Sequence, residues 1–561
     1  MHKKIRLAIK LFISVAILLF MCGFAVNASA ETVFPSGDKT GATDKRNIQK
    51  ALNTGGTITL QNGSNYFLNG RVIVKVEGTK LIATGAVITQ KAIGVGMIRN
   101  DFGDKGGYDG IGNFSIIGGD WVENVSANAG PGGYSVFFFA HAKGIKVQKV
   151  VFRNAYNAHM VEFAGCKDSI IENCTMGGKY VGTSRKEAIQ LDITHNSDMV
   201  GAGPKKDDTP CYNITIRKNH ITFPRGIGSH AAVDNHYHNK IRIQKNTINT
   251  QYEGILLLSY YNTTIEDNII NAKLAGINFR TASSPEFSWF FPALKKNEKR
   301  TRKNEKKYKL IIRRNKFSNV SNAILLYATS KKRAVGTIIK NNVVYNSKRT
   351  AIWSQWSRSA QISNNTISNV TGTAIYFSNG ASSIVNKNTI KNASVSAVSA
   401  YKSASSTISS NKISKCKASA IMLTGSNSVK VNKNAIAVLK SGRGIEIQDS
   451  ANGSITKNKL SAVSSYNKVP IYFRGKVSGF NVKNMRRFVV KDINKNDKSI
   501  TGKGNNYGKV YTVLHKKSYY GKFKKKQFVI SSIPKLKKSQ TVAMKQNDKG
   551  KNVFTKKYTV K

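Results

Sequence analysis

Cysteine is scarce in this sequence. Cys22 lies near the N-terminus, and the other four cysteines are scattered through the rest of the chain. None of the four shows the paired spacing that zinc ligands require. We therefore expect Cys166, Cys174, Cys211 and Cys416 to pack as small apolar residues in a core, and we assign no metal ligands and no disulfides.

Acidic side chains are also few for a chain of this length. The 29 Asp and Glu residues stand against 89 Lys and Arg, which gives a formal net charge of +60. A surface this basic attracts polyanions such as acidic polysaccharide, wall teichoic acid, anionic lipid or nucleic acid. Nucleic acid is the least favoured, because no recognition motif accompanies the charge. The alternative is that the charge only keeps the surface soluble.

No hydrophobic run has the length of a membrane span. The apolar stretch at 11–26 is shorter than the roughly 20 residues needed to cross a bilayer. It follows four basic residues and precedes Ala28-Ser29-Ala30, which is the pattern of a secretory signal peptide ending at residue 30. We expect a secreted, extracellular, monomeric protein with no transmembrane anchor, held at an anionic cell wall by charge alone.

The sequence is rich in a repeated motif, apolar-x-x-Asn-x-apolar. Its asparagines are Asn219, Asn246, Asn268, Asn315, Asn342, Asn365, Asn388, Asn411, Asn434 and Asn458. From Asn342 onward the steps are 23, 23, 23, 23 and 24 residues. A fixed period of this size predicts a solenoid. We expect an earlier member at Asn173, and a structural role for the asparagines in the turns between coils.

A second signature in each coil is a small residue followed by an aliphatic one, as in Ala188-Ile189, Gly254-Ile255 and Ala374-Ile375. Together the two signatures predict two short strands per coil, with aliphatic side chains packed inside. Near the start, SGDKTGATDKRNIQKALN (36–53) predicts a helix capped by Thr43 or Asp44, with Ile48, Ala51 and Leu52 on its apolar face.

With this helix, and with NFSIIGGDW at 113–121, the chain resembles the pectate lyase superfamily. The resemblance covers roughly residues 33–475. It implies an all-β fold, a right-handed parallel β-helix over 31–475 whose open N-terminal end is covered by the helix. From 476 to 561, with a core at about 489–561, short alternating runs resemble bacterial Ig-like β-sandwich modules.

The titratable residues are unevenly distributed. Seventeen of the 29 acidic residues lie between 101 and 280, and seven of the nine histidines lie between 141 and 238. Residues 315–470 contain only Glu446 and Asp449 as acids, and no histidine. A purely structural solenoid does not need histidines in one third of its length, so we place the functional site in the early coils.

Aligning the coils on the small-aliphatic signature brings three of these residues together. If Ile189 points inward, strand alternation sends Asp192 outward, and His230 takes the equivalent position one coil later, roughly 4.8 Å away. Glu162 falls in or near the same column one coil earlier. This row of two carboxylates and an imidazole is our predicted catalytic group. The alternative is an outward row of ion-paired side chains that binds no substrate.

Other residues are expected to bind the substrate. Arg225 and Arg280 are suited to clamp a sugar carboxylate, because a guanidinium pairs with it in bidentate fashion. The remaining predicted substrate-binding residues are Glu187, His195, His159 and Trp353.

We therefore predict a secreted enzyme that cleaves an acidic, uronate-containing polysaccharide. In β-elimination, His230 or a nearby base takes the proton beside the uronate carboxylate; in hydrolysis, Glu162 and Asp192 divide the acid and base roles. The N-T-D, G-D-D, G-H-G and R-I-K segments of the polygalacturonase branch are absent, which argues against pectin hydrolysis. The resemblance to the superfamily includes calcium-dependent pectate lyases, so Ca²⁺ is a candidate cofactor. The rival function is a non-catalytic surface protein that binds glycan or teichoic acid.

Overall fold

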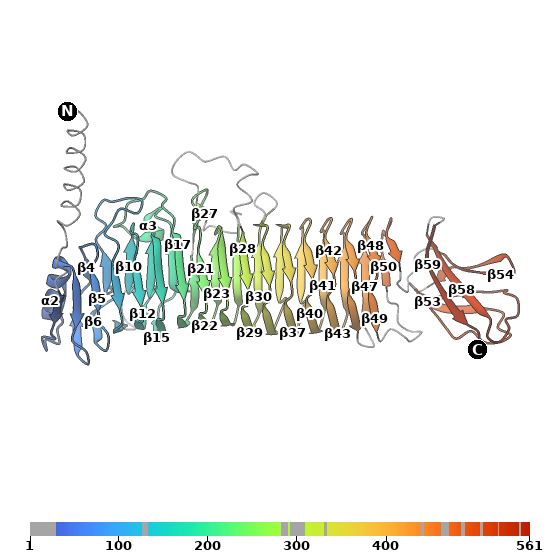
Figure 1. Ribbon diagram of the computed structural model, residues 1–561, viewed down its shortest axis with the longest axis horizontal. Coiled ribbons are helices and arrows are strands. Elements are labelled where there is room, and N and C mark those ends of the chain that lie inside the picture. Colours follow the sequence, from blue (N-terminus) through green and yellow to red (C-terminus); the bar gives the residue numbers. More distant parts are fainter. Residues whose placement is uncertain are drawn as a thin grey trace, which may run out of the picture.

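The computed structural model describes residues 30–125, 133–229, 231–281, 290–291, 309–329, 334–438, 442–461, 471–483, 488–504, 509–524, 527–548 and 551–561. Most of the chain winds into a long stack of coils in which each strand pairs in parallel with the equivalent strand of the next coil (Figure 1). The fold is the predicted all-β, right-handed parallel β-helix.

Each regular coil contributes three strands, one to each of three parallel sheets that we name A, B and C. Sheet A runs from β1 (Ala30–Val33) to β51 (Asn481–Lys483), and sheet B from β3 (Asn65–Leu68) to β49 (Lys459–Ser461). The prediction of two strands per coil was wrong, because the residues after each ladder asparagine form a short sheet B strand of their own. In one coil, the side chains of Ile216 from sheet A, Ile221 from sheet B and Ile227 from sheet C pack into the common core, and each is at most 1% exposed.

Sheet C carries the functional features described below. Its strands are β4 (Val72–Val74), β7 (Ile98–Asn100), β10 (Phe137–Ala140), β13 (Val161–Ala164), β16 (Glu187–Asp192), β19 (Arg225–Gly228), β23 (Glu253–Leu258), β26 (Ala275–Arg280), β30 (Asn322–Tyr327), β34 (Ile352–Gln355), β38 (Ile375–Ser378), β41 (Ser396–Tyr401), β44 (Ser419–Thr424), β47 (Arg443–Gln448) and β50 (Ile471–Arg474).

Helix α2 (Ala42–Thr54) covers the N-terminal end of the solenoid, as predicted, and buries its apolar face there (Figure 1). Its N-cap is Gly41 rather than Thr43 or Asp44. Gly41 has a φ of 87°, and a Cβ at this position would lie 2.6 Å from the backbone of Leu68, so only glycine fits. Asp44 lies inside the helix, and its carboxylate accepts hydrogen bonds from the amides of Ser36 (2.8 Å) and Phe67 (2.9 Å). This carboxylate therefore ties the helix to the first coil.

The repeated asparagines form a buried ladder at the turn between sheets A and B. Each accepts, through Oδ1, the backbone and side-chain N–H groups of the asparagine one coil earlier, at 2.8–3.0 Å. The first member is Cys174, not Asn173: the amide of Cys174 donates to Asn219 Oδ1 at 2.9 Å. Asn173 instead takes the left-handed turn position, with a φ of 56°. All four described cysteines are free and buried.

The C-terminal residues form two small antiparallel sheets around a separate core that includes Phe488, Val510 and Phe528. The strands are β52 (Phe488–Val490), β53 (Ile500–Gly504), β56 (Phe523–Lys524) and β57 (Gln527–Ile530) in one sheet, and β54 (Lys509–Leu514), β55 (Lys517–Gly521), β58 (Thr541–Asp548) and β59 (Lys551–Thr559) in the other. The Ig-like assignment and the domain boundaries at 30, 475 and 476 stay predictions.

Within the described ranges, no helix is both long and apolar enough to cross a membrane. The predicted signal peptide lies, apart from Ala30, outside the described residues.

Candidate functional site

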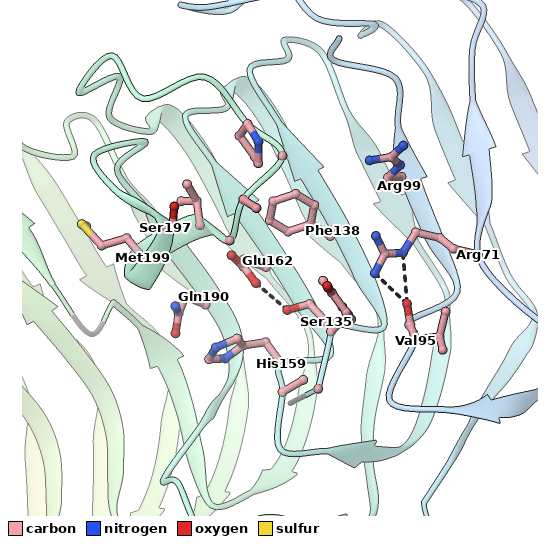
Figure 2. A pocket seen from close by; sticks show the side chains of 18 of the residues that line it. Arg71, Val95, Arg99, Ser135, Phe138, His159, Glu162, Gln190, Ser197 and Met199 are labelled. Atoms are coloured by element: carbon pink, nitrogen blue, oxygen red, sulfur yellow. Dashed lines mark hydrogen bonds between the residues drawn. The ribbon is translucent and has the colours of Figure 1, made fainter. Parts of the chain in front are cut away.

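A cleft of ≈600 Å³ lies on the outer face of sheet C, over its first five strands (Figure 2). Its floor carries one outward side chain from each strand, namely Ile73, Arg99, Phe138, Glu162 and Gln190. The opposite wall is the short helix α3 (Ser197–Val200) with the loop that runs on to Pro204. The segments at 133–135 and 157–159 close the side.

Strand register explains why these floor residues form one column. Ile73 pairs with Arg99, Arg99 with Phe138, Phe138 with Glu162, and Glu162 with Gln190. Because side chains alternate along a strand, the flanking residues, such as Val161 and Phe163, face the core. Asp192 pairs with Ala164, so it lies two residues along the same face from Gln190 and diagonal to Glu162.

Glu162 is the carboxylate on the cleft floor. Its side chain is only 7% exposed, and the hydroxyl of Ser135 donates a hydrogen bond to Oε2 (Figure 2). A second carboxylate, Asp198 of α3, lines the opposite wall and is exposed. The cleft therefore presents one enclosed and one solvated carboxyl group.

Basic groups lie at one end of the cleft. Arg71 donates from Nε and Nη2 to the carbonyl of Val95 at 3.1 and 2.6 Å, and its guanidinium lies 4.7 Å from the ring centroid of Tyr134. Burial, and next the charge of Arg99, lower the pKa of Arg71 from its ordinary value. Figure 2 shows both arginines on the side of Glu162 away from Met199. Lys186 is a third cationic residue of the lining.

Asp192 is fully buried, and its strand neighbour Ala164 belongs to the small apolar cluster that also contains Met199 and Val200. The side-chain amide of Gln190 donates a hydrogen bond from Nε2 to Oδ2 of Asp192 at 2.6 Å. Burial raises the pKa of Asp192 to about 8; the contact with Gln190 opposes this rise, and the charge of Glu187 adds to it. Glu162 also acts on this carboxyl through a side-chain hydrogen bond. Asp192 is therefore largely protonated at neutral pH.

Predicted binding residues Glu187, His159 and Arg225 form a network beside the cleft. Arg225 Nη1 lies 3.2 Å from Glu187 Oε1, and Arg225 Nε lies 2.8 Å from Glu253 Oε2. His159 Nδ1 lies 2.8 Å from the carbonyl oxygen of Glu187, and His159 is the member of this network that lines the cleft. The guanidinium of Arg225 is thus held by two carboxylates of the protein.

The other predicted residues lie outside the cleft lining. His195 Nδ1 contacts Asp208 Oδ1 at 2.5 Å in a loop. Arg280 donates to Asn278 Oδ1 at 3.2 Å, and burial lowers its pKa. Trp353 lies much further along sheet C, with ring centroids 5.3 Å from Tyr327 and 5.6 Å from Tyr376.

His230, the predicted imidazole of the catalytic row, lies outside the described residues. The register of its neighbours is consistent with the alignment that placed it, because Ile189 pairs with Ile227 and Gln190 with Gly228. Its contact with Asp192 stays a prediction.

Sequence reasoning missed the residues of the basic end, Arg71, Arg99 and Tyr134, because it searched the acids and histidines between 101 and 280. A signal was present: Arg71 and Arg99 are isolated arginines in the apolar segments GRVIVK and GMIRND of consecutive coils. The contribution of α3 had no comparable signal, since a loop position depends on long-range packing.

The described residues do not fit the calcium ion that the family resemblance left open. They contain no group of three or more His, Cys, Asp or Glu side chains placed to hold a metal ion. We therefore derive no chemical step through a metal.

Comparison with known proteins concerns the fold. A family model described as "Right handed beta helix region" matches residues 302–438. Comparison with curated protein sequences gave no match.

Several solved structures are similar to this chain. PfbA, a surface adhesin of Streptococcus pneumoniae, is 15% identical over 83% of this chain and 98% of its own, with a TM-score of 0.41. A mutant tailspike protein of E. coli bacteriophage HK620, in complex with a pentasaccharide, is 12% identical over 87% and 86%, with a TM-score of 0.43. The A-module of a mannuronan C-5 epimerase of Azotobacter vinelandii is 11% identical over 80% and 99%, with a TM-score of 0.28. At residues 302–438, the sequence itself is thus similar to right-handed β-helix regions.

Proposed function

We propose that this protein is a secreted enzyme that cleaves an acidic polysaccharide in the cleft on sheet C. The observation that carries the proposal is that one cleft holds an enclosed carboxyl group, Glu162, together with two arginines, Arg71 and Arg99, from adjacent coils.

The basic end is suited to a uronate carboxylate. A guanidinium binds a carboxylate through two parallel N–H groups, and burial strengthens such a pair. Nε and Nη2 of Arg71 are directed at Val95, which fixes the guanidinium plane at the cleft wall. The rings of Tyr134 and Phe138 offer apolar faces for a sugar ring.

The carboxyl groups supply acid and base. Glu162 lies on the floor beside Asp192, whose raised pKa keeps a proton in the buried pair. In hydrolysis, Glu162 donates a proton to the departing sugar oxygen and Asp198 activates water or attacks the sugar. In β-elimination, Glu162 or His159 takes the proton beside the uronate carboxylate, and the arginines stabilise the charge that develops there. The bond from the uronate ring to the glycosidic oxygen then breaks as the ring double bond forms, and the departing oxygen takes a proton from water. Where Glu162 is the acid or the base, Asp192 acts through it.

The test is a panel of uronic-acid and neutral polysaccharides incubated with the mature chain. Absorbance near 230 nm reports the unsaturated ends of elimination, and new reducing ends without that absorbance report hydrolysis. Glu162→Gln is expected to lower the rate by at least about 100-fold, the usual contribution of a general acid or base.

Sheet C offers a matched control. Glu446 lies in the same outward column, and the hydroxyl of Ser419 donates to it at 2.6 Å, as Ser135 does to Glu162. Because Glu446 is far from the cleft, Glu446→Gln should keep the wild-type rate. Equal losses in the two variants would contradict a catalytic role for Glu162.

The rival function is non-catalytic glycan binding, and one observation favours it. Glu187 and Arg225, both expected at the substrate, bind each other. If no polysaccharide in a broad panel yields product, while an acidic one binds and Arg71→Gln weakens that binding, the protein is a binding protein.

A further inference from the structure

The turn between sheets A and B, which we call the ladder corner, carries a row of lysines in the late coils. Each ladder asparagine is buried, so the residues just before and after it project outward. The residues before the asparagines are Lys387, Lys433 and Lys457, each with a φ of 54°. Those after are Lys412 and Lys459. All five side chains are exposed.

The row is continuous over four coils. Asn388, Asn411, Asn434 and Asn458 are joined by direct hydrogen bonds, so each coil follows the last by one strand spacing, roughly 4.8 Å. Every one of these coils places at least one lysine at the ladder corner. The described residues thus present a line of positive charge parallel to the solenoid axis.

Nothing in the described residues neutralises this line. None of the five lysines makes an ion pair there. The only acids between 315 and 470 are engaged elsewhere: Glu446 pairs with Arg443 at 2.8 Å on sheet C, and Asp449 accepts from the amide of Lys476 at 2.8 Å.

The early coils treat the same corner differently. Two residues before the ladder position, Arg217 pairs with Glu172 at 2.5 Å, and Arg313 pairs with Glu266 at 2.6 Å. Arg314 pairs with Asp267 at 2.7 Å. Carboxylates therefore lie among the basic residues in the early half of the corner, where Lys218 and Lys245 are exposed too, whereas the late half has lysines on successive coils and no carboxylate. Stacked like charges destabilise a sheet, and an anion lying along them relieves the repulsion.

We propose that the late ladder corner is a docking line for a linear phosphate polymer that lies along the solenoid. The row favours phosphate over uronate because it offers separate cationic points, which suit phosphate groups, and has no aromatic ring on which the sugar ring of a uronate would stack. The row contains lysine and no arginine. The five positions are interleaved with Ser410, Thr389 and Ala435, and have no aromatic ring on which a nucleic-acid base would stack.

This site is separate from the cleft. Because every coil passes from sheet A to B to C, the corner between A and B lies across the coil from the face of sheet C. A polymer on the ladder corner leaves the cleft open. The two proposals therefore stand or fall independently.

The experiment measures binding of inorganic polyphosphate of defined length to the full mature chain at several salt concentrations. The test variant is Lys387→Gln/Lys412→Gln/Lys433→Gln/Lys457→Gln. The control, Lys348→Gln/Lys391→Gln/Lys402→Gln/Lys415→Gln, removes the same charge from exposed positions outside the corner. Both keep the basic C-terminal sheets intact.

For the test variant, the slope of log affinity against log salt should fall in magnitude by about 3, since each lost phosphate contact contributes about 0.7. The control should keep a nearly wild-type slope. Equal loss in both variants would show general attraction to a basic surface and overturn the docking line. A polyuronate or single-stranded oligonucleotide of equal charge that binds more tightly through the same lysines would overturn the phosphate assignment.

Discussion

At the scale of single residues, Asp192 is the side chain whose charge state most depends on the fold. It is fully buried, and its pKa is raised to about 8 from an ordinary value of 3.8. The neutral form is therefore favoured by folding. The contribution of this pKa difference to the free energy of unfolding is fully present below pH 3.8 and is lost as the pH rises through 8.

This predicts a pH-dependent difference between the wild type and Asp192→Asn. Relative to the variant, the wild type should lose free energy of unfolding between pH 6.5 and 8, by at most about 1.4 kcal/mol per pH unit. His238, whose pKa burial lowers to about 3, is present in both proteins, so its contribution cancels in the comparison. Glu123, whose pKa burial raises to about 8, is present in both proteins and cancels in the comparison. Urea unfolding at successive pH values measures the effect, and parallel pH profiles would contradict it.

At the scale of the structural element, the asparagine ladder links each coil to the next. Asn388 Oδ1 accepts the backbone and side-chain N–H groups of Asn365, both at 2.9 Å. Its Nδ2 donates to the carbonyl of Ile362 at 2.9 Å and to Asn411 Oδ1 at 3.0 Å. One buried side chain thus satisfies polar groups in two neighbouring coils.

Asn388→Ala should therefore cost about 2–5 kcal/mol, because it leaves several buried polar groups without a partner. Thr389→Ala is the matched control, since Thr389 is the next residue and is exposed. That change should stay within about 0.5 kcal/mol. Urea unfolding of both variants measures the difference, and similar values for the two would contradict a stabilising ladder.

At the scale of the whole molecule, charge opposes folding. A formal net charge of +60 places many like charges within about 10 Å of one another, a distance over which 0.1 M salt screens them. Raising NaCl from about 0.05 M to about 0.5 M should increase the free energy of unfolding by about 0.2–1 kcal/mol for each stacked pair of like charges. The four-lysine ladder-corner variant should gain less than the wild type. An equal gain in both would place the repulsion elsewhere.

The repeats were predictable because each coil makes nearly the same contacts with its neighbours, so the asparagines and inward aliphatics recur at a fixed period. That local rule predicted the solenoid and placed Glu162 and Asp192 on the outer face of the early coils. The capping helix was predicted separately, from the pattern at 36–53 and the family resemblance. The local rule did not separate sheet B from its neighbours, because one inward residue per short strand leaves too little alternation to detect. The sequence reasoning also predicted that Arg225 binds the substrate. In the structure, its guanidinium instead pairs with Glu187 and Glu253.

The sequence by itself determined the scaffold, the buried asparagine ladder and the contrast between acid-bearing early coils and basic late ones. Only the tertiary structure decided that Arg71, Arg99 and Glu162 share a cleft, that α3 walls it, and that Asp192 is fully buried. The physical reason is range. A repeat depends on contacts between adjacent coils, so its residues recur at a fixed period in the sequence. A cleft depends on how irregular loops pack across several coils, and the residues that determine this packing do not recur.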